Sequence, residues 1–198
     1  MTTHPNEKAQ AFDITAFMRR LCADMVARLP ELSHIRLSQV AIAFSQVRKS
    51  GQYGIFASLT PLRFQHGALE RIRRGRRYRV QRLLGDDGRE MLYILTFYLP
   101  RFLDLDFREK LITIFHELWH ISPEFNGDIR RHSGRCHVHT HSQAQYDEEM
   151  GRLADRWLAQ APAESLWGDL RYSFEELQAR QGRVVGVKIA RPKLFPVV

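Results

Sequence analysis

The residues best suited to chemistry in this sequence are two histidines and a glutamate in the stretch His116-Glu117-Leu118-Trp119-His120. On a helix, residues four apart lie on one face about one turn from each other, so both imidazoles can bind one metal ion. The glutamate then lies beside the open coordination position, where its carboxylate can take a proton from an activated water. This spacing predicts a Zn²⁺ site held by His116 and His120, with Glu117 as the general base of peptide hydrolysis.

The residues around this motif predict a buried helix from about Asp106 to Ile121. Asp104 and Asp106 can cap its N-terminus. A shuffled chain of this composition would contain the His-Glu-x-x-His motif by chance only about 0.02 times. Large apolar side chains occupy most other positions of the helix: Leu111, Ile112, Ile114, Phe115, Leu118, Trp119 and Ile121. Polar side chains on such a helix need partners. The alternative to a metal site is a core helix whose histidines donate to backbone carbonyls.

A catalytic zinc site needs a third protein ligand and an open position for water. His137, His139 and His141 alternate just ahead of a predicted helix, so an extended segment would point all three the same way. Other possible donors also follow the motif: Glu124, Asp128, His132, Cys136, Asp147, Glu148 and Glu149. Four protein ligands, with Cys136 among them, would make the site structural, so a non-catalytic zinc-binding interaction protein is one alternative function.

An oxyanion formed during peptide hydrolysis would need a further hydrogen-bond donor. The candidates all follow the motif: Tyr146, Arg130, Arg131 and His132. The two arginines could instead pair with Glu124 or Asp128 and hold the loop after the helix. The sequence does not choose among these roles.

Hydrophobic periodicity predicts an α+β fold, with a small, mostly antiparallel sheet packed against the motif helix and two or three further helices. The further helices are expected at 13–30, 142–160 and 163–181, with a short one within 67–77. Strands are expected within 34–47 and 55–62, in a hairpin of 78–84 with 90–99, and at 184–189. Residues 1–12 are expected to be a flexible leader, and residues 13–198 a single domain with an Arg- and Pro-containing tail from about residue 190.

Composition favours a protein of the cytoplasm. The chain has 198 residues, 44% of them hydrophobic, and its first residues lack the apolar run of a signal peptide. No apolar stretch is long enough to span a bilayer, so no membrane partner is expected. The chain has two cysteines, Cys22 and Cys136, which is too few for a disulfide framework.

A dense group of arginines dominates the net charge of +8. Seven arginines lie between positions 71 and 82: Arg71, Arg73, Arg74, Arg76, Arg77, Arg79 and Arg82. This Arg71–Arg82 cluster could bind nucleic-acid phosphates or an acidic protein, or it could simply keep an edge strand soluble and unpaired. Tyr78 is the one aromatic residue within it, so base stacking has little support from the sequence.

The stretch from His116 to His132 resembles a family of metallopeptidases found in phages, bacteria and archaea, and is more distantly similar to the SprT-like proteins. In addition, His139-Thr140-His141-Ser142, followed by Tyr146-Asp147, resembles the family's His-Gly-x-Ser stretch before an aromatic–Asp pair. The resemblance covers most of residues 40–160. It implies a zincin-like fold, in which an edge strand holds an extended protein or peptide substrate above the motif helix.

This resemblance implies that His139 is the third zinc ligand, with His141 as second choice and His137 as third. The likeness to SprT-like proteins also implies an alternative function as a protease of DNA-bound proteins, in which the Arg71–Arg82 cluster contacts nucleic acid.

Overall fold

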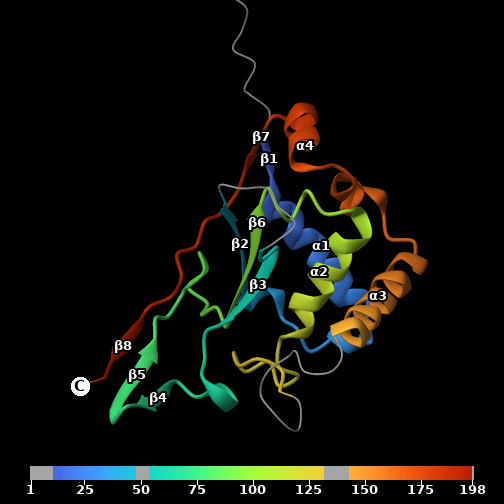
Figure 1. The fold of residues 1–198 in the computed structure, drawn as a ribbon. Coiled ribbons are helices and arrows are strands. Elements are labelled where there is room, and N and C mark those ends of the chain that lie inside the picture. Colours follow the sequence, from blue (N-terminus) through green and yellow to red (C-terminus); the bar gives the residue numbers. More distant parts are fainter. Residues whose placement is uncertain (1–10, 48–53, 132–142, 198) are drawn as a thin grey trace, which may run out of the picture.

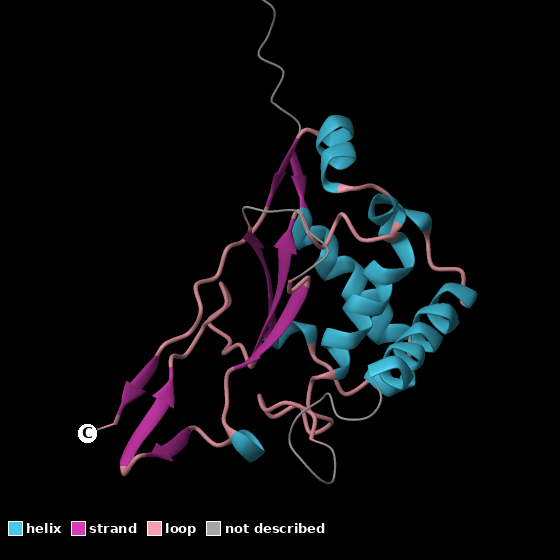
Figure 2. Ribbon diagram, viewed as in Figure 1, coloured by secondary structure: helices cyan, strands magenta, loops and turns pink. Residues whose placement is uncertain are grey.

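The computed structural model describes residues 11–47, 54–131 and 143–197, and a three-stranded sheet lies at its centre (Figures 1 and 2). Strand β6 (Tyr93–Leu99) is the middle strand. It pairs in parallel with β2 (Val40–Gln46) and antiparallel with β3 (Ala57–Pro61). Strand β6 is buried over most of its length, whereas β3 is only partly buried and forms an edge of this sheet.

The motif helix is α2 (Phe107–Trp119), close to its predicted bounds. Its N-terminus is closed by a capping box. The Asp106 side chain accepts from the backbone N–H of Glu109 at 2.8 Å, and the Glu109 side chain accepts from the backbone N–H of Asp106 at 3.4 Å. The helix lies against β3 on one side and against α3 (Gln143–Ala159) on another. Its apolar spacing and its cap therefore place the motif between a sheet edge and a neighbouring helix.

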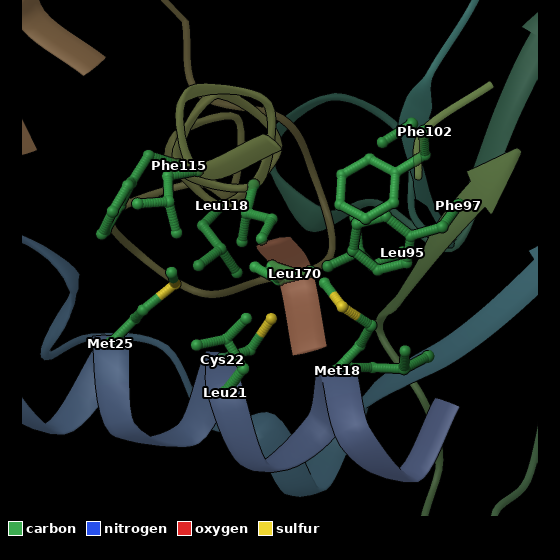
Figure 3. Packing of buried hydrophobic residues seen from close by; sticks show 14 of the residues in the cluster. Met18, Leu21, Cys22, Met25, Leu95, Phe97, Phe102, Phe115, Leu118 and Leu170 are labelled. Carbon is green, nitrogen blue, oxygen red and sulfur yellow. The ribbon is translucent and has the colours of Figure 1, made fainter. Parts of the chain in front are cut away.

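The core that holds α2 in place is built on α1 (Ile14–Arg28), which starts at the predicted cap Asp13. Side chains of α1 point toward α2 and β6, as Figure 3 shows for Met18, Cys22 and Met25 opposite Leu118 and Phe97. All of these side chains are buried. Fully burying a side chain of this size contributes roughly 1.5–3 kcal/mol, so the position of α2 relative to the sheet is strongly fixed.

The predicted helix at 163–181 is wrong in its first half. The regular helix there is α4 (Phe174–Gln181), preceded by two short 3₁₀ helices, η4 (Glu164–Leu166) and η5 (Gly168–Arg171). The Nζ atom of the buried Lys110 on α2 donates to the carbonyls of Leu170 and Tyr172, each at 2.8 Å. Because this lysine takes the carbonyl groups that a continuous helix would use, the helix begins only after Ser173.

The predictions for residues 67–99 also need correction. Residues 70–73 and 76–80 form a hairpin of β4 (Glu70–Arg73) and β5 (Arg76–Val80), where a helix was expected over 67–77. Arg74 and Gly75 form the two-residue turn with φ of 51° and 74°, which is the geometry that closes a tight hairpin. The expected hairpin of 78–84 with 90–99 is reduced to one bridge, Leu84 to Glu90, because β6 already pairs with β2 and β3 on its two sides.

The remaining elements form two small sheets and short turns. Strand β8 (Leu194–Pro196) pairs with β5, and β1 (Ala11–Asp13) pairs in parallel with β7 (Arg183–Val185). Three further 3₁₀ helices are η1 (Pro30–Leu32), η2 (Leu37–Gln39) and η3 (Gln65–Gly67). The α+β prediction with mostly antiparallel pairing is confirmed, while the division into a leader and a single domain stays a prediction. No helix in the described ranges is long and apolar enough to cross a membrane.

Candidate metal and active site

Both motif histidines lie on one face of α2, as the sequence predicts. The ring centroids of His116 and His120 are 4.7 Å apart and their planes are nearly perpendicular. The ring of Tyr146, from the first turns of α3, contacts His116 edge-on at 4.8 Å and stacks on His120 at 6.2 Å. The Tyr146 hydroxyl is buried and has no hydrogen-bond partner among the described residues. The Tyr146 ring therefore lies against both imidazoles.

Glu117 occupies the buried side of this region, with 9% of its surface exposed. Burial raises the pKa of its carboxyl to about 7, although a hydrogen bond from the backbone of Leu59 on β3 acts in the opposite direction. A cation bound nearby would favour the charged carboxylate and lower this pKa. Glu117 thus links the motif helix to the sheet edge through the Leu59 backbone.

The outer edge of β3 presents backbone groups to this region. Phe56 accepts a hydrogen bond from the backbone of Tyr98, and Leu62 donates to Leu92, each at 2.9 Å. In an antiparallel pair the hydrogen-bonding direction alternates from residue to residue, so Ala57 and Leu59 direct their backbone groups away from β6. The Leu59 hydrogen bond to Glu117 agrees with this direction.

A groove of about 620 Å³ runs between α2 and residues 54–57, which lead into β3, and His116 and Glu117 lie in its wall. The groove is mixed in polarity: Phe56, Leu105 and Ile112 line it together with Glu109, Thr113 and Asp147. Such a surface can accept an apolar group close to the motif.

The loop that follows the motif is held by buried hydrogen bonds. The hydroxyl of Tyr93 on β6 donates to the carbonyl of Asp128 at 2.9 Å and accepts from the backbone N–H of Gly127 at 3.0 Å. Sequence reasoning missed Tyr93, because nothing in an apolar strand indicates which distant loop its hydroxyl reaches.

Both arginines of this loop form hydrogen bonds within the protein. This is the structural role that was the alternative to stabilising an oxyanion. Arg131 donates to the two carboxylate oxygens of Asp128 at 2.8 and 2.9 Å. Arg130 donates to the carbonyl of Trp119 at 2.7 Å and lies over the Trp119 ring at 4.0 Å. Among the described candidates, Tyr146 is therefore the one whose donor atom is buried and unused.

The predicted third ligands lie outside the described residues: His132, Cys136, His137, His139 and His141. Of the other candidates, Glu124 accepts from Asn126 and Glu148 pairs with Arg152, each at 2.7 Å. Within the described ranges no three metal-binding side chains come together. The described part of the site supplies two imidazoles beside a carboxylate, and these donor types fit a divalent metal ion such as zinc.

A helix that carries the His-Glu-x-x-His motif is typical of metal-dependent peptidases. A protein-family model described as "Putative phage metallopeptidase" matches residues 11–156. This range spans most of the chain and contains the central sheet, α1, α2 and most of α3, so the chain belongs to this family. The resemblance to a phage metallopeptidase family noted in the sequence is confirmed, while the more distant similarity to SprT-like proteins stays a prediction. No curated protein and no solved structure matches the chain at a significant level.

Proposed function

We propose that this protein is a zinc-dependent peptidase that uses Glu117 as its general base. The observation that carries the proposal is the buried Glu117 carboxyl, placed between two imidazoles of one helix face and the open edge of β3. The family implies a metal and a protein substrate. Cys22 is buried as a free thiol. The expected location of the protein is the cytoplasm, where thiols stay reduced.

His116, His120 and His139 would hold the metal, with His141 and then His137 as alternatives to His139. Imidazole ligands and a glutamate suit Zn²⁺, although nitrogen and oxygen donors also accept other divalent ions. When bound, Zn²⁺ supplies a Lewis acid that acidifies water and polarises a carbonyl. Glu117 takes a proton from the attacking water and passes it to the leaving nitrogen.

The edge of β3 and the groove would hold the substrate. An extended peptide can pair with the backbone groups of Ala57 and with the carbonyl of Leu59, whose N–H donates to Glu117, as strands add to a sheet edge. One substrate side chain would then enter the groove near Phe56 and Ile112, so we expect a preference for apolar residues at that subsite. Tyr146 would donate its hydroxyl to the developing oxyanion, which is supported by its buried, unused oxygen beside both histidines.

The test compares two glutamates of the same helix. Glu117→Gln should bind about one zinc per chain and lose hydrolysis of an unfolded protein substrate. Glu109→Gln is the control, because Glu109 also lines the groove. The Glu109 side chain caps α2 by accepting from the backbone N–H of Asp106, and a glutamine side chain can accept the same hydrogen bond.

Hydrolysis retained by Glu117→Gln would remove Glu117 from this role. A wild-type protein that binds no zinc would overturn the proposal as a whole. Zinc bound without any hydrolysis would favour the non-catalytic interaction protein.

A further inference from the structure

The small sheet β4-β5-β8 lies apart from the α-helices and the motif (Figure 1). It carries most of the Arg71–Arg82 cluster, whose role the peptidase proposal leaves open. Residues directly opposite each other in an antiparallel sheet lie on the same face, so the strand register assigns each arginine to one of two faces. The two faces differ in their charge compensation.

The arginines on one face of this sheet form ion pairs with a carboxylate. Glu70 lies opposite Arg79 in the register and forms ion pairs with both Arg79 and Arg77. Beyond the end of β5, Arg82 pairs with Glu90 at 2.9 Å. Each of these three arginines therefore has a carboxylate partner, although Arg77 and Arg79 share Glu70 and Glu90 also pairs with Arg63.

The opposite face carries arginines that are not compensated in this way. Arg71 lies opposite Tyr78, and Arg73 opposite Arg76, while Arg74 occupies the turn. In the described part of the chain none of these arginines forms an ion pair: Arg71, Arg73, Arg74 and Arg76. All four are exposed. Because the positive charges of neighbouring arginines repel each other, binding of an external polyanion would stabilise this face.

This face also contains a cavity with an aromatic wall. A hollow of about 360 Å³ is lined by Arg71, Arg73, Arg74, Tyr78 and Leu194. A second aromatic ring, that of Phe64, lies 5.3 Å from the Arg71 guanidinium. Guanidinium groups around an aromatic ring are the combination that binds the phosphates of single-stranded nucleic acid and stacks its bases. A duplex keeps its bases stacked inside and would leave the ring unused.

We propose that this arginine face, formed by Arg71, Arg73, Arg74 and Arg76 around Tyr78, binds single-stranded nucleic acid. The arginines contact the phosphates, and an unstacked base enters the cavity beside Tyr78. This site is independent of the metal site, and its test uses no hydrolysis.

The experiment measures the binding of a fluorescently labelled oligothymidylate by anisotropy at several salt concentrations. A triple variant, Arg71→Gln, Arg73→Gln and Arg76→Gln, removes three charges from the arginine face. Each lost phosphate contact lowers the slope of log K against log salt by roughly 0.7 for a single strand, so the slope should fall by about 2 and the affinity by about 100-fold near 0.1 M salt.

The matched control removes the same number of charges from the ion-paired arginines, as Arg77→Gln, Arg79→Gln and Arg82→Gln. This variant should bind much more tightly than the first one. Tyr78→Leu should weaken binding by about 10-fold with little change in the salt slope, because it removes a stacking surface and no charge. Far-UV circular dichroism and thermal unfolding verify that each variant is folded.

Several outcomes would overturn the proposal. Equal losses in the two triple variants would show that net charge alone attracts the oligonucleotide. Tighter binding of duplex DNA would reject the single-strand assignment, and equal competition by polyglutamate would point to an acidic protein instead. Absence of binding at low salt would reject the site.

Discussion

Replacing Tyr93 by phenylalanine tests how the loop after the motif is held. The Tyr93 side chain is fully buried, and its hydroxyl satisfies both the N–H of Gly127 and the carbonyl of Asp128. Phenylalanine keeps the ring but leaves one buried donor and one buried acceptor without a partner. Each such group costs roughly 1–3 kcal/mol. Allowing for some relaxation, Tyr93→Phe should lower the free energy of unfolding by about 2–4 kcal/mol.

Urea unfolding followed by circular dichroism measures this loss, and an unchanged m-value would show that the unfolded states are comparable. Tyr98→Phe on the same strand is the control. The Tyr98 hydroxyl is only partly buried and has one contact, to Ser58 Oγ at 3.2 Å, so its removal should cost less than about 1 kcal/mol. Similar losses in the two variants would refute the reasoning, because burial and the number of satisfied groups would then not determine the cost.

Three further predictions concern the site itself. Tyr146→Phe should lower kcat by about 10²–10³ with unchanged zinc content, as expected for an oxyanion donor; an unchanged kcat in steady-state assays would reject that role. His139→Ala should lose bound zinc while His141→Ala retains it, as measured by atomic absorption, and the reverse result would move the third ligand to His141. Asp128→Asn should change the pH dependence of stability. Burial alone would raise the Asp128 pKa, but hydrogen bonds, chiefly from Arg131, hold it below its usual 3.8. The charged carboxylate therefore stabilises the fold above that pH, and this contribution is lost as pH falls through the lower folded pKa. The difference between wild type and Asp128→Asn in thermal unfolding should be largest at neutral pH and shrink below about pH 4; a constant difference would contradict the assignment.

Local sequence signals determined the elements that carry the motif. The caps Asp13 and Asp106 lie at the ends of α1 and α2, as predicted. The spacing of His116 and His120 requires only a helix to place both rings on one face, and the helix follows from apolar periodicity and a capping box. These features depend on residues within one or two turns of each other, so the sequence alone was sufficient to predict them.

Contacts between distant segments decided the rest. A continuous helix at 163–181 was predicted because its periodicity is local, but Lys110 takes two of its carbonyls from about 60 residues away. The predicted hairpin of 78–84 with 90–99 was wrong because β6 pairs with β2 and β3 instead, and no local pattern reveals this pairing.

The site, too, has features that follow from local sequence and features that depend on contacts between distant segments. Its histidines and glutamate follow from local spacing, whereas three neighbours required the tertiary structure: the Leu59 backbone, the Tyr146 hydroxyl and the Tyr93 hydroxyl. Likewise, the sequence shows seven clustered arginines, and only the tertiary structure separates those paired with carboxylates from those that form no ion pair in the described part of the chain. Pairing between strands depends on which segments compete for each edge, and that competition is settled by the packing of the whole chain.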